Sequence, residues 1–336
     1  MDPLLLTILV VVFALAFDLT NGWNDAANAI ATVVSTRVLR PMTAVLFGAV
    51  LNFAGAMVSS EVAKTVGRDI ADPSLLTPAT FLAGTLVAPI WITICTFRAL
   101  PISCSHSLMG GLIGAVLATT GPSGLKASGL EKIVFGVFTS PVLGFAGGFL
   151  VMVIVYRLCR RMRPYTVTRW FSKLQLVSAG MMAFSHGTGD AQKAMGIITG
   201  ALISAGYLSL DADGDMSIPL WTRLACATVM GIGTAWGGWR VIRTLGARLA
   251  RLKPHHGFAA ETGAAITILA NTLTGVPIST THSITGAITG VGAVQGVRAV
   301  KWGVGKKILF AWVVTFPACI GGGAVVFGLF RVLGVA

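Results

Sequence analysis

Two copies of one fourteen-residue segment lie far apart in this chain of 336 residues. The first begins at Pro101 and reads PISCSHSLMGGLIG, and the second begins at Pro277 and reads PISTTHSITGAITG. The two copies have the same residue at seven of the fourteen positions. Such self-similarity indicates that the chain consists of two related halves, because repeated segments mark repeated structural units.

A second pair of related segments precedes the first pair. NGWNDAANAI begins at Asn21 and HGTGDAQKAM begins at His186, and their alignment places Asp25 opposite Asp190. Each half therefore carries an acidic motif followed by a Ser/Thr-His motif. Internal repeats of this kind are typical of secondary transporters, in which the substrate site lies between the repeats near the middle of the membrane. Small residues that recur only for helix packing would explain neither the paired aspartates nor the paired histidines.

The composition independently predicts an integral membrane protein. Hydrophobic residues make up 54% of the chain and charged residues 11%, whereas about a quarter of the residues in a soluble protein are charged. The five cysteines are scattered without metal-ligand spacing and are interpreted as core residues. The net charge of +13 comes from basic residues clustered in short loops. This is the pattern of cytoplasmic loops, so we expect no nucleic-acid partner.

The loop charges predict the topology. Basic clusters at 157–173, 240–253 and 298–307 are expected in the cytoplasm, and the acidic loop at 208–217 is expected outside. About ten segments are long enough to cross a bilayer, because each crossing needs about twenty apolar residues. They are residues 4–36, 41–62, 78–98, 101–119, 133–156, 177–203, 218–239, 258–275, 278–297 and 308–332. Five segments fall in each half, so the predicted fold is all-α with two inverted five-span repeats and both termini outside.

The predicted division of the chain follows the motif pairs. Residues 1–156 form the first inverted repeat, 157–176 a basic cytoplasmic linker, and 177–336 the second repeat. We expect a multi-pass protein of the cell membrane, surrounded by lipid, in which one helix bundle rocks or gates around a central site. Many carriers form dimers, so a homodimer is an open expectation.

The acidic motif is expected to break the first helix near the middle of the membrane. Asn21, Gly22, Asn24 and Asp25 interrupt a long apolar run there. Interrupted or re-entrant helices occur at membrane depth only where the freed backbone groups face protein or a watery cavity, and they often form ion and anion sites.

The prolines of the second motif predict similar interruptions. Pro101 and Pro277 suit the first turn of a helix. Hydroxyl residues follow both prolines, and they are Ser103, Ser105, Ser279, Thr280 and Thr281. Their hydroxyl groups can join free backbone N–H groups as donors to an anion. Ordinary helix capping is the alternative role for each of them.

Together the motifs resemble those of the inorganic phosphate transporter family of secondary carriers, in particular its bacterial low-affinity permease branch. The resemblance rests on NGWNDAANA, HGTGDAQKAMG, GFAAE at 257–261 and the two PIS motifs, and it covers essentially the whole chain. It implies import of inorganic phosphate by symport with protons or sodium ions, in some relatives as a metal–phosphate complex, and no further cofactor. The residues that it places around substrate and coupling ion are Asn24, Asp25, Asn28, Asp190, Gln192 and the Ser and Thr residues of both PIS motifs.

One position departs from the family pattern. Gly189 stands where the second acidic motif usually has an asparagine, as the first motif has at Asn24. Glycine cannot supply an amide ligand, so backbone or water fills the position or one ion site is weakened.

Two carboxylates beside an anion require a compensating cation, because they would repel phosphate inside a low-dielectric cavity. Sodium bound to Asp25 or Asp190, protons on these carboxylates, or a divalent metal arriving with the phosphate would each supply the charge. A carboxylate also accepts a hydrogen bond from the P–OH group of phosphate, whereas sulfate has no such proton, and this favours phosphate. The alternative for either aspartate is a structural role at a helix break.

Two further charged residues are candidates. Lys193 aligns with Asn28 and lies three residues after Asp190, so it can bind phosphate or form an ion pair with that aspartate. Glu261 precedes the second PIS motif and is a candidate for the coupling ion or proton. A solvated position at the membrane interface is the alternative for Glu261.

Two other functions are compatible with parts of this sequence. A permease for another oxyanion, such as sulfate, would need only a few different contacts in the same fold. An intramembrane aspartyl protease is the remote alternative, because Gly187 to Asp190 fit the GxGD pattern and Asp25 could complete a dyad. A single catalytic dyad has no use for two duplicated motifs, so the sequence favours a transporter over an enzyme.

Overall fold

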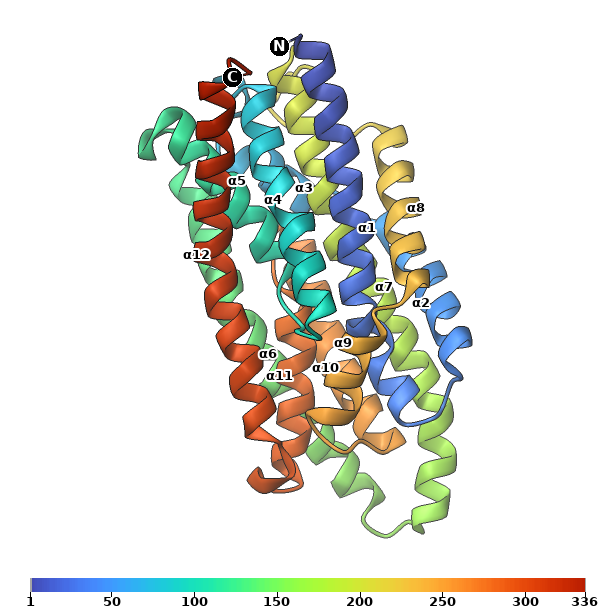
Figure 1. Cartoon of the computed structure of the whole chain (residues 1–336). Helices are drawn as coiled ribbons and strands as arrows, with labels where there is room; N and C mark the ends of the chain where they lie inside the picture. Colours follow the sequence, from blue (N-terminus) through green and yellow to red (C-terminus); the bar gives the residue numbers. More distant parts are fainter. Residues whose placement is uncertain (1, 336) are drawn as a thin grey trace.

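The protein is described by a computed structural model, which covers residues 2–335 (Figure 1). These residues form α-helices and no β-strand, which confirms the predicted all-α class. The helices are α1 (Pro3–Ser35), α2 (Pro41–Ala56), α3 (Glu61–Lys64), α4 (Pro78–Phe97), α5 (Cys104–Thr120), α6 (Ala127–Cys159), α7 (Pro164–Ser204), α8 (Leu220–Trp236), α9 (Trp239–Arg243), α10 (Pro254–Leu273), α11 (Thr280–Val294) and α12 (Trp302–Val332).

The order of elements in the first half recurs in the second. A π-helical turn follows α3 at Thr65–Asp69 and another follows α9 at Thr244–Arg248. Each half also has one isolated backbone bridge, Ala71 to Leu125 and Ala250 to Val300. In Figure 1, α1 runs away from the end that holds both termini, whereas α7 runs toward it. This arrangement agrees with the duplication that the motifs indicate.

Fewer helices meet the requirements for a membrane span than the ten segments predicted. Among the described residues, four helices are long and apolar enough, namely α1, α4, α6 and α12, and a fifth span results if α2 and the bent segment 61–69 count as one. The bend between these two parts is 69°. With 17 and 15 residues, α5 and α11 are too short to cross alone. The predicted number of crossings is therefore not confirmed.

The first helix is not broken at the acidic motif, which corrects the sequence-based expectation. It continues through Asn21, Asn24 and Asp25 to Ser35. Asparagine and aspartate interrupt helices when their side chains bond to the local backbone. Here none of these side chains bonds to the local backbone: Asn24 Nδ2 donates to Thr96 Oγ1 of α4 at 2.7 Å, and Asp25 accepts from Thr281 of α11. Helix α7 is likewise continuous through the second acidic motif.

The interruptions lie instead before α5 and α11. The prolines precede these helices, and neither proline occupies a first helical turn. Ser103 and Ser279 are the N-caps. The side-chain oxygen of each serine accepts a hydrogen bond from the backbone N–H three residues later, at 3.2 Å. Both helices therefore begin inside the protein. The predicted linker at 157–176 contains the end of α6, a short turn and the first turns of α7.

Glycines allow the helices that carry the acidic motifs to pack very closely on their neighbours. A Cβ atom at Gly22 would lie 2.5 Å from the carbonyl oxygen of Met230 on α8. A Cβ atom at Gly187 would lie 2.1 Å from the carbonyl oxygen of Asn52 on α2. Such close approach is typical of small residues at helix interfaces in membranes. It fixes both acidic motifs in the middle of the bundle.

Candidate functional site

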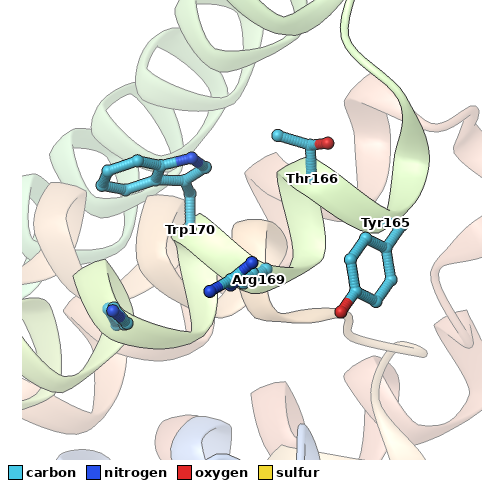
Figure 2. A pocket seen from close by; sticks show the side chains of 5 residues that line it. Tyr165, Thr166, Arg169 and Trp170 are labelled. Atoms are coloured by element: carbon cyan, nitrogen blue, oxygen red, sulfur yellow. The ribbon is translucent and has the colours of Figure 1, made fainter.

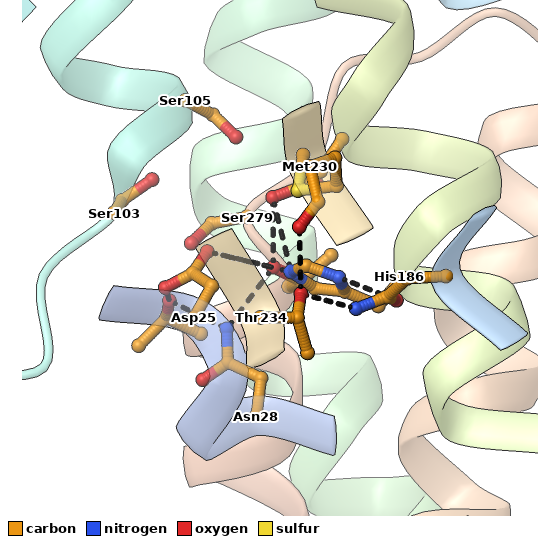
Figure 3. A network of polar contacts seen from close by, with 12 residues as sticks. Asp25, Asn28, Ser103, Ser105, His186, Met230, Thr234 and Ser279 are labelled. Carbon is orange, nitrogen blue, oxygen red and sulfur yellow. Dashed lines mark hydrogen bonds and ion pairs between the residues drawn. The ribbon is translucent and has the colours of Figure 1, made fainter. Parts of the chain in front are cut away.

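The two acidic motifs meet in the interior. Asp25 of α1 and Asp190 of α7 are 1% and 0% exposed, and His186 of α7 lies close to both. Figure 3 shows Asp25 and His186 within the network of polar contacts. The Nε2 atom of His186 is 3.7 Å from Asp25 Oδ2 and 3.5 Å from Asp190 Oδ2. Ligand atoms of these three side chains all lie within 4.8 Å of one another. This geometry suits the binding of one cation, because carboxylate and imidazole groups are common metal ligands.

The beginning of α11 closes the site with hydroxyl groups. Thr281 Oγ1 donates to Asp25 Oδ1 at 3.1 Å, and Thr280 Oγ1 lies 3.4 Å from Asp25 Oδ2 and 3.3 Å from Asp190 Oδ2. The side-chain amide of Asn28 donates to both threonine oxygens, at 3.2 and 3.0 Å. Five predicted residues from both halves, Asp25, Asn28, Asp190, Thr280 and Thr281, therefore converge at one helix N-terminus. Helix N-termini favour anions, because their backbone N–H groups lack partners within the helix.

One ammonium group balances part of the negative charge. Lys193 is fully buried, and its Nζ pairs with Asp190 Oδ1 at 2.5 Å. The structure thus contains the ion pair that was one of the two roles considered for Lys193. Two carboxylates and one ammonium together carry an excess of one negative charge.

His186 is a site residue that sequence reasoning did not single out. Its Nδ1 is 3.0 Å from Asn52 Oδ1 on α2, and Asn52 Nδ2 donates to Thr234 Oγ1 on α8 at 2.8 Å. These contacts fix the ring so that Nε2 faces the two aspartates. The available signal was its position four residues before Asp190, which places both on one face of a helix.

The serines of the PIS motifs lie beside the site but bond elsewhere (Figure 3). Ser103 and Ser279 cap their helices, as described above. Ser105 Oγ donates to the carbonyl oxygen of Ile278 at 3.2 Å. This carbonyl belongs to the second PIS motif, so the hydroxyl of Ser105 links the two halves.

Three other predicted residues have partners away from the two aspartates. Asn24 bonds to Thr96 on α4. Gln192 Oε1 accepts hydrogen bonds from the backbone N–H groups of Val62 and Ala63, at 2.8 and 3.1 Å, so it caps α3. Glu261 forms a separate buried group, described next.

Glu261 on α10 is held by three side-chain donors. Thr32 and Ser178 donate their hydroxyl protons to its two carboxylate oxygens, and Gln175 Nε2 donates to Oε1 at 3.1 Å. The side chain is 0% exposed. The interfacial, solvated position considered for Glu261 is therefore wrong.

The position of Gly189 is occupied from the opposite helix. A Cβ atom at Gly189 would lie 2.9 Å from Thr272 Oγ1 on α10. In the first half, the equivalent contact is the hydrogen bond between Asn24 and Thr96. A threonine hydroxyl thus stands next to the place that an asparagine side chain would fill.

A surface pocket of about 350 Å³ lies far from this cluster, at the start of α7 (Figure 2). Its lining residues are Tyr165, Thr166, Arg169, Trp170 and Lys173. They belong to the basic segment predicted to be cytoplasmic and include none of the predicted site residues.

The family model described as the phosphate transporter family matches residues 21–167 and 159–323. The chain belongs to the phosphate transporter family. Its motifs were identified correctly from the sequence. Family membership and the apolar helices make it a multi-pass membrane protein.

Curated relatives match almost the entire chain. A "probable low-affinity inorganic phosphate transporter" of Rhizobium meliloti (strain 1021) is 45% identical over 94% of this chain and 93% of its own length. A protein with the same description from Bacillus subtilis (strain 168) is 42% identical over 98% of both chains. Both descriptions are of transporters, which favours transport over the protease considered above.

A solved structure has the same fold. It is described as "The sodium-dependent phosphate transporter", and the two structures agree with a TM-score of 0.87 over 98% of this chain and 99% of that chain. The sequences are 24% identical.

Proposed function

We propose that the protein imports inorganic phosphate across the cell membrane by symport with a cation. The observation that supports this most strongly is the meeting of Asp25 and Asp190, one from each half, at the N-terminus of α11. Donors for an anion surround the same point: the amide of Asn28, the hydroxyls of Thr280 and Thr281, and the ammonium of Lys193.

The site chemistry explains why an anion carrier would need a cation. Phosphate would be repelled by two carboxylates in a site closed to solvent. A sodium ion between Asp25, His186 and Asp190, a proton, or a divalent metal that accompanies phosphate each lowers this repulsion. Binding of either substrate then favours binding of the other, which is the basis of symport.

The aspartates also give a reason for selecting phosphate. A P–OH group can donate a hydrogen bond to a carboxylate oxygen, whereas sulfate at neutral pH leaves that buried acceptor unpaired. A permease for sulfate is the second candidate, because the hydroxyl and amide groups could donate hydrogen bonds to either anion.

Alternating access would use the two halves as inverted repeats. The opposite directions of α1 and α7 in Figure 1 support this assignment. Both termini lie at the end away from the basic turn between α6 and α7. Under the positive-inside rule, this arrangement supports a cytoplasmic position for the turn and an outside position for the termini. The site residues are closed to solvent, with Asp25 1% and Thr281 1% exposed, so transport requires the bundle to open alternately to each side.

The test is uptake of radiolabelled phosphate into proteoliposomes that contain the purified protein. Proton and sodium gradients are imposed separately, and an excess of sulfate is added in a further arm. We expect uptake that follows one gradient, resists sulfate and is lost in Asp25→Asn. Asp213→Asn, in the exposed acidic loop, is the matched control and should transport like the parent.

Two outcomes would contradict the proposal. Uptake that sulfate abolishes would assign the protein to the second candidate function. Uptake that survives in Asp25→Asn would show that phosphate transport does not depend on the acidic cluster.

A further inference from the structure

A fourth buried acid lies outside the cluster described above. Asp18 is on α1, seven residues before Asp25, and its side chain is 0% exposed. Neither carboxylate oxygen has an N–H or O–H donor within hydrogen-bond distance. The other buried acids among residues 2–335 all have donors: Asp25 has threonines, Asp190 has a lysine, and Glu261 has three side chains. Asp18 is therefore the exception that needs an explanation.

The surroundings of Asp18 cannot stabilise a negative charge. The thiol of Cys226 on α8 faces the carboxylate of Asp18. The charged groups nearest to this carboxylate are Asp190 and Lys193 of α7, and they already form an ion pair with each other. Helix α4, which also packs on α1, has no charged residue, and Cys95 is its one titratable group. The titratable residue of α10 that contacts α1 is Glu261. It bonds to Thr32, near the other end of α1 from Asp18. An unpaired carboxylate at such a place would cost many kcal/mol, so it must carry a proton or bind a cation.

The available ligands favour the proton. Hard cations require several oxygen ligands. The polar group of α8 that faces Asp18 is the thiol of Cys226, which supplies sulfur and no oxygen. Asn21, one turn along α1, adds a single amide oxygen. A proton needs no further ligand, because the neutral acid is tolerated in apolar surroundings.

Two further buried polar side chains without partners lie one turn from Asp18 on α1 and one turn from Cys226 on α8. Asp18, Asn21 and Asp25 are spaced by three and four residues, so they share one face of α1. Both side-chain atoms of Asn21 are buried without a partner. On α8, Thr222 lies four residues before Cys226, near the outer end of that helix, and its buried hydroxyl also lacks a partner.

We infer that Asp18 is the site that takes up the coupling proton, separate from the phosphate site at Asp25 and Asp190. A proton from the outside water bonds to one carboxylate oxygen and gives the neutral acid, which the closed conformation holds. The same O–H bond breaks when the bundle opens inward, and the proton leaves to the cytoplasmic water. This inference rests on the proposed phosphate symport and names its coupling ion.

The test compares the parent with Asp18→Asn in proteoliposomes. Asparagine has the shape of the neutral acid but cannot release a proton. We expect Asp18→Asn to lose phosphate accumulation driven by a proton gradient and to lose the phosphate-dependent proton entry that an internal pH dye reports. It should still exchange labelled for unlabelled phosphate across the membrane. Cys226→Ala, which changes the facing thiol, is the matched control and should keep proton-driven accumulation.

Each result decides one claim. Proton-driven accumulation by Asp18→Asn would overturn the inference, as would uptake by the parent that depends on sodium alone, and in both cases phosphate transport itself would stand. No phosphate transport by the parent under any gradient would refute the proposed function instead. A third result would also overturn the inference. It is an Asp18→Asn variant that elutes from size exclusion like the parent but has lost both phosphate exchange and phosphate accumulation. Infrared difference spectra provide a second readout, because the carbonyl band of the protonated acid should be absent from Asp18→Asn.

Discussion

At the scale of single residues, the site depends on how its charges are paired. Lys193 and Asp190 are both buried and bonded to each other. Removing one partner of such a pair leaves an uncompensated charge in the interior. The position that matches Lys193 in the first half is Asn28, a neutral donor. The two halves therefore supply different charges to one site, as the proposed binding of an anion together with a cation requires.

Lys193→Met tests this charge pairing. The variant should lower the free energy of unfolding by about 3 kcal/mol, because Asp190 keeps its charge without a partner. Thermal unfolding of the detergent-purified protein measures the change. Adding Asp190→Asn to the same chain should recover part of the loss, since the remaining pair is neutral. Equal stability of the parent and Lys193→Met would contradict the ion pair.

At the scale of elements, distant side chains cap the short helices. Helix α3 has four residues, and the side chain of Gln192 on α7 accepts from its N-terminal N–H groups. The same glutamine donates to Thr188, one turn earlier on α7, through Nε2. Gln192 thus ties the bent segment after α2 to the helix that carries Asp190. The family resemblance implied a substrate ligand at this position. The contact to α3 was not predictable from the sequence, because it depends on tertiary structure.

Gln192→Leu distinguishes the two roles of this residue. As a cap, Gln192 satisfies two buried N–H groups, and its loss should cost about 1–3 kcal/mol of stability. The midpoint of thermal unfolding should fall accordingly. Parent-like stability combined with lost phosphate binding would contradict the capping role and support the substrate-ligand role.

At the scale of the whole molecule, duplication made much of the protein predictable. Repeated motifs identified the family, the helical class and the residues that converge, including Asp25, Asp190 and Thr281. The continuity of α1 was not predictable, because it depends on bonds from Asn24 to another helix. The isolation of Asp18 and the role of His186 also depend on which helices pack together. Sequence periodicity along one helix does not contain that information.

The central claim is that phosphate binds where the two halves meet, and a crystal structure determined with bound phosphate tests it most directly. We expect density for one phosphate within hydrogen-bond distance of Asn28, Thr280 and Thr281. Density only at the surface pocket formed by Arg169 and Lys173, in protein that transports phosphate, would show that phosphate does not bind between the halves.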